Sequence, residues 1–86
     1  MNTALRILSK AIAEVDRLEE VTTAAADDMS MPEENYNALV NAEVMAIDRA
    51  AEALITATSG GIDADTARLM VLTKREKIAA LLARCA

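Results

Sequence analysis

The chain has 86 residues and a formal net charge of −5, and 53% of its residues are apolar although only 1% are aromatic. This length fits one domain, residues 1–86, near the size at which a single core is only marginally stabilising. Sandwiches and barrels are excluded because their strands and turns depend on aromatic residues, glycine and proline, and the chain has 1 aromatic residue, 2 glycines and 1 proline. The composition therefore predicts an all-α fold.

The same numbers exclude several functional classes. An acidic chain is repelled by phosphate backbones, so direct binding of nucleic acid is not expected. The chain has no histidine and so lacks the commonest general base and metal ligand. No stretch approaches the roughly 20 apolar residues that cross a bilayer, and the amino terminus does not read as a signal peptide. We expect a cytoplasmic protein that is not an enzyme, holds no cofactor and does not enter membranes.

The first predicted helix spans about residues 3–28. Leu5, Leu8 and Ile12 recur at spacings of three and four, which places them on one face. The helix ends on Asp27 and Asp28, where the helix dipole disfavours negative charge. These two acids then lie close to the start of the next helix, where negative charge is favourable.

The second predicted helix spans about residues 31–58 and is the central one. Ser30 and Glu33 have the spacing of a capping box, and Ser59-Gly60-Gly61 ends the run. Two apolar rows follow its length: Val40, Val44, Ile47, Ala51 and Leu54 in one, and Ala38, Ala42, Ala46, Ala50, Ala53 and Ala57 in the other. Two rows require more than one partner helix.

The third predicted helix spans about residues 64–84, with Asp63 as its cap. Leu69 and Leu72 belong to an apolar surface that covers more than half of its circumference. Short links make neighbouring helices antiparallel. The result is a three-helix up-down-up bundle, or a helical hairpin plus a third helix, and an edge helix this apolar predicts a self-associating protein or one with a protein partner.

Charge is divided along the chain, with acids gathered in residues 1–34 and bases in residues 59–86. In the up-down-up arrangement, the basic segment 74–77 faces Glu19 and Glu20 of the first helix. Glu43 and Lys74 each interrupt an apolar face. We expect them to form a structural ion pair, because a charge left unpaired in a helix seam costs several kcal/mol.

These patterns predict a non-catalytic, acidic helical protein that acts by protein–protein binding, as a regulator or inhibitor or as a self-assembling subunit. The candidate partner-binding residues are Glu19, Glu20, Asp27, Asp28, Glu33, Glu34, Tyr36, Leu69 and Leu72. One alternative is an acidic decoy of the kind that phages and mobile elements encode, whose carboxylates imitate a phosphate backbone and block a nucleic-acid-binding protein machine. Another is a metal-binding helical bundle that uses the clustered carboxylates, although their spacing fits no EF-hand loop.

Overall fold

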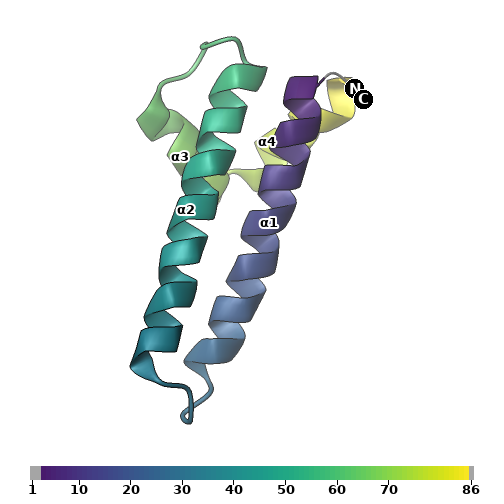
Figure 1. Ribbon diagram of the computed structural model, residues 1–86. Coiled ribbons are helices and arrows are strands. Elements are labelled where there is room, and N and C mark those ends of the chain that lie inside the picture. The colour runs from purple at the N-terminus through teal and green to yellow at the C-terminus, as the bar shows by residue number, and fades with distance from the viewer. Residues whose placement is uncertain (1–2, 86) are drawn as a thin grey trace.

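The computed structural model describes residues 3–85, which form four helices and contain no strand (Figure 1). The helices are α1 (Thr3–Ala26), α2 (Glu33–Ala57), α3 (Ala64–Thr73) and α4 (Arg75–Cys85). The all-α prediction is confirmed. The side chain of Cys85 lies outside the described part of the chain.

The two long helices make an antiparallel hairpin, and the two short ones cover one side of it (Figure 1). α3 packs on α2, and α4 reaches α1. Both short helices lie against the half of the hairpin that contains the start of α1 and the end of α2 (Figure 1). The other half, toward the turn at residues 27–32, consists of α1 and α2 alone.

The core lies where the four helices meet. Its largest fully buried side chains are Leu8, Val15, Leu54, Val71 and Ile78, so each helix contributes at least one. Between them lie small residues of α2, among them Ala46, Ala50 and Ala53. Alanine at a helix contact permits a short interaxial distance, so the hairpin closes without aromatic side chains.

The turn between α1 and α2 differs from the prediction. Ser30 does not cap α2. Its backbone N–H and its hydroxyl both donate to Oδ1 of Asp28, at 3.0 and 2.6 Å. These hydrogen bonds hold the pKa of Asp28 below its usual value. α2 begins instead at Glu33 after Pro32, with no side-chain cap, so the capping-box prediction is wrong because Asp28 competes successfully for the Ser30 hydroxyl.

The link between α2 and α3 agrees with the local signals. Gly60 has a positive φ of 78°, and its N–H donates to the carbonyl of Ile55 at 2.9 Å, which closes α2. Asp63 then caps α3 by accepting a hydrogen bond from the backbone N–H of Thr66 at 2.7 Å. That hydrogen bond lowers the pKa of Asp63. The predicted cap is confirmed.

The prediction of a single third helix over residues 64–84 is wrong, because the helix is interrupted at Lys74 (φ −129°, ψ 46°). The Lys74 N–H still donates to the carbonyl of Met70 at 2.9 Å, and Arg75 Nε donates to the carbonyl of Val71 at 2.5 Å. The side chain of Arg75 thus replaces the backbone donor that a continuous helix would supply. After the break, α4 runs back toward the start of α1 (Figure 1) and buries Ile78 in the core. The predicted up-down-up path therefore ends at Thr73.

Candidate interaction surfaces

An apolar patch lies on the seam between α2 and α3. Arg68 of α3 pairs with Asp48 of α2. One turn further from the connecting loop on each helix lie Leu72 and Val44, because residues four apart share a helix face. Leu69 is three residues before Leu72 and adjoins it. Val44, Leu69 and Leu72 are 49%, 52% and 54% exposed, and we call these three residues the α2/α3 patch.

The sequence pattern singled out two of these residues but not the third. Leu69 and Leu72 stand on the surface, as expected for the second apolar row of that helix. Val44 belongs to a row of α2 that the pattern placed inside, yet α1 and α3 leave it half exposed. The sequence feature that could have identified Val44 as exposed is the apolar surface of α2, which is wider than two neighbouring helices can cover.

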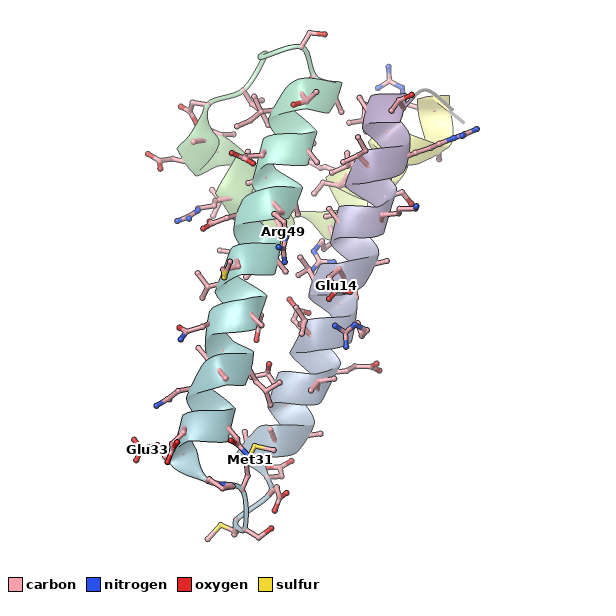
Figure 2. All side chains as sticks on the ribbon, viewed as in Figure 1. Glu14, Met31, Glu33 and Arg49 are labelled. Atoms are coloured by element: carbon pink, nitrogen blue, oxygen red, sulfur yellow. The ribbon has the colours of Figure 1, made fainter. Side chains whose placement is uncertain are left out.

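A groove runs between α1 and α2 on the side away from α3 and α4, where Figure 2 labels Glu14 and Arg49. It encloses about 450 Å³ and is lined by Ala4, Ile7, Lys10, Ala11, Glu14, Ala46, Arg49, Glu52, Ala53 and Thr56. We call it the α1–α2 groove. Its four alanines keep it shallow, and Ile7, 56% exposed, is its one large apolar side chain.

The charged residues of this groove alternate in sign. Each helix contributes one acid and one base: Lys10 and Glu14 from α1, and Arg49 and Glu52 from α2. Glu14 also accepts two hydrogen bonds from Arg17, at 3.0 and 2.5 Å. These bonds and the nearby charge of Arg49 hold the pKa of Glu14 below its usual value. The groove is therefore neutral in a chain whose net charge is −5.

The predicted acidic residues near the turn share one end of the molecule. Asp27, Asp28, Glu33 and Glu34 are exposed there, and Figure 2 labels Glu33 at this end. Tyr36 is half-buried beside them and lines a shallow depression together with Ala25, Ala26 and Met31. Among the described side chains, no three Asp, Glu, His or Cys residues converge as metal ligands.

The other predicted charges have mixed outcomes. Arg75 pairs with Glu19 at 3.3 Å and also with Asp16, so the basic segment does meet the first helix through this residue. Glu20 is exposed and is not among the ion pairs of the described residues. The ion pair predicted between Glu43 and Lys74 does not form. Lys74 ends α3 with an exposed side chain, while Glu43 is half-buried on α2.

These surfaces suit recognition by shape, apolar contact and charge. None of the helices in residues 3–85 combines the length and the apolar character needed to span a bilayer. Comparisons of the chain with models of protein families, with curated proteins and with solved structures found no match.

Proposed function

We propose that the protein acts without catalysis, by binding another protein through the α2/α3 patch. The observation that carries this proposal is the exposure of Val44, Leu69 and Leu72, each about half exposed, at positions that helical spacing places on neighbouring turns of the packed helices α2 and α3. A single exposed leucine is ordinary on a protein surface. Several adjacent ones are typical of a surface that a partner covers.

The shape of the patch indicates the kind of partner. The seam lies between two antiparallel helices, so an amphipathic helix laid along it would place apolar residues against the patch at spacings of three and four. The exposed acids near the turn add a negative field, which raises the rate of encounter with a basic partner. A regulator, an inhibitor or an assembling subunit would use the patch in the same way.

The test is site-specific cross-linking in the native host. A photoreactive residue replaces Leu72 in one variant and Ala13, an exposed residue of α1, in the control variant. We expect a protein that is captured from position 72 and not from position 13. The purified partner is then titrated against the double variant Leu69→Ser/Leu72→Ser, and its Kd should rise about 10- to 100-fold, because two leucine contacts are lost. An unchanged Kd would refute the proposal.

The acidic decoy is distinguished with the same purified partner. Neutralising Asp27, Glu33 and Glu34 to their amides removes three exposed charges and leaves Asp28 to hold Ser30. A decoy would lose affinity in this triple variant, would bind less tightly in high salt and would ignore the leucine substitutions. The metal alternative predicts a higher Tm in calcium, magnesium or zinc, because a ligand of the folded state stabilises it.

A further inference from the structure

We propose that α4 is an exchangeable helix, so that two copies of this chain swap their α4 helices and form a dimer in which α3 and α4 run as one unbroken helix. In the structure, α4 folds back onto its own hairpin, toward the start of α1 (Figure 1). In the dimer it would occupy the same place on the second copy. The inference concerns the connection at Lys74 and does not rest on the proposed function.

The connection between α3 and α4 is the first argument. Lys74 is the single residue between them, and its N–H already donates to the carbonyl of Met70 at 2.9 Å, as in a continuous helix. A change of φ and ψ at Lys74, from −129° and 46° to helical values, would therefore join the two helices. No glycine or proline opposes this change, because all three such residues of the chain lie before residue 62. Residues 69–79 are mostly good helix formers.

The way in which α4 is held on the hairpin is the second argument. Its fully buried anchor is Ile78, and Leu81 and Leu82 pack half-buried against the same core. Arg75 adds ion pairs with two acids of α1. A second copy presents the same core and the same acids, so exchange of α4 re-forms these contacts, which makes swapping a low-cost route to a dimer.

The side chain of Arg75 is compatible with both arrangements. In the structure its Nε donates to the carbonyl of Val71 at 2.5 Å. In an unbroken helix the backbone N–H of Arg75 would donate to that carbonyl instead, because Val71 lies four residues earlier. The carbonyl stays satisfied, and the guanidinium remains available to the acids of α1 on the second copy.

A swapped dimer is favoured over a straight helix in a single chain. Because α4 turns back at Lys74, straightening the connection would withdraw Ile78 from its own core. A monomer with a straight helix would therefore expose an isoleucine that is now fully buried and would leave its place in the core empty, which is unfavourable. In the swapped dimer, each empty place is filled by Ile78 of the other chain. The dimer thus gains the continuous helix and keeps the core.

The first experiment compares two variants that remove the same charge at the connection. Alanine favours a helix and glycine disfavours it, and helix formation differs between them by about fivefold per residue. A swapped dimer contains two such connections, so the dimer Kd of Lys74→Gly should be about 25-fold higher than that of Lys74→Ala. Sedimentation velocity from micromolar to millimolar concentrations measures both values. Wild type should also shift from its monomer mass of 9.2 kDa toward twice that value.

The second experiment shows whether α4 changes chains. One variant, Asp16→Lys/Glu19→Lys, makes α1 basic at the contact, and the other, Arg75→Glu, makes α4 acidic there. Each variant alone meets like charges, both as a monomer and as a dimer with itself. In a mixture, a swapped heterodimer brings opposite charges together at both contacts, so a dimer should form only in the mixture. The control replaces the first variant with Glu20→Lys/Asp27→Lys, which makes the same change of charge at exposed positions and should not give this heterodimer.

Three outcomes would overturn the proposal. The first is a wild type that stays monomeric at every concentration, and the second is an equal dimer Kd for Lys74→Ala and Lys74→Gly. The third is a mixture of the two charge variants that associates no more than the control mixture.

Discussion

Arg75 holds the break between α3 and α4 against α1, and its removal gives a quantitative prediction. Its Nε donates to the Val71 carbonyl at 2.5 Å, one terminal nitrogen pairs with Asp16, and the other lies 3.3 Å from Glu19. The side chain is only 27% exposed. Three acceptors in different directions match the planar fork of arginine, which a lysine ammonium does not reproduce. We predict that Arg75→Ala destabilises the protein and that Arg75→Lys restores less than half of the loss.

The magnitude follows from the exposure of the partners. Asp16 and Glu19 are each about half exposed, so each ion pair contributes about 0.5 kcal/mol. The hydrogen bond to the Val71 carbonyl is less exposed and contributes about 1 kcal/mol. Arg75→Ala should therefore lower the free energy of unfolding by about 2 kcal/mol. For a chain of this size, that loss lowers Tm by about 10 °C.

The assay is urea unfolding followed by circular dichroism, at low salt and in 1 M NaCl. High salt screens the two ion pairs, so the difference between wild type and Arg75→Ala should shrink toward the contribution of the carbonyl hydrogen bond. Lys77→Ala, an exposed change two residues along α4, is the control and should stay near zero. A loss below about 0.5 kcal/mol for Arg75→Ala would show that this cluster does not hold α4.

Three further predictions concern single side chains. Ile78 of α4 is fully buried, so Ile78→Ala should lower the free energy of unfolding by about 2–4 kcal/mol. It should also abolish amide-exchange protection in α4 before α1 and α2, and an equal loss in all helices would contradict this. Thr22 Oγ1 is buried with no hydrogen-bond partner, so Thr22→Val should raise the free energy of unfolding by about 1 kcal/mol in the same urea assay, whereas a decrease would indicate that the hydroxyl has a partner. The hydrogen bond from Thr66 lowers the pKa of Asp63 in the folded state. The ionised Asp63 carboxylate therefore stabilises the protein fully above the ordinary aspartate pKa of about 3.9, and this stabilisation is lost as pH falls through the lowered pKa. In Asp63→Asn this contribution to the pH dependence of Tm should disappear. The Thr66 amide shift, followed by NMR, should titrate below that ordinary value, and a midpoint at or above it would be the contrary result.

The parts of the fold that depend on neighbouring residues were predictable. The spacing of apolar residues predicted the long helices. Gly60 ends α2 and Asp63 begins α3, each through a hydrogen bond to a residue a few positions away. The Ser30 cap failed for a local reason as well. Asp28 and Glu33 both offer carboxylates near Ser30, and sequence alone does not say which arrangement is more stable.

The break at Lys74 is of a different kind. No glycine or proline stands there, and the apolar rows continue across it, so local sequence favours one unbroken helix. Burial of Ile78 and the hydrogen bonds of Arg75 offset the unusual backbone of Lys74 only in the folded chain. The same limit applies to Val44, because its exposure depends on how far α3 extends along α2. The full extent of the α2/α3 patch could therefore be identified only from the three-dimensional structure.

The partial cover that α3 and α4 give the hairpin makes the molecule unequal from end to end. At the end without them, the inward side chains of α1 after Leu18 are Thr22 and Ala25, which bury little apolar area. Two helices alone, closed on small or polar contacts, separate at low free-energy cost. Melting should thus start at Met29, whose side chain is almost fully exposed, and travel toward the four-helix end. A protease that cleaves the turn at residues 27–32 would leave the α1–α2 groove and the α2/α3 patch on the more stable part of the chain.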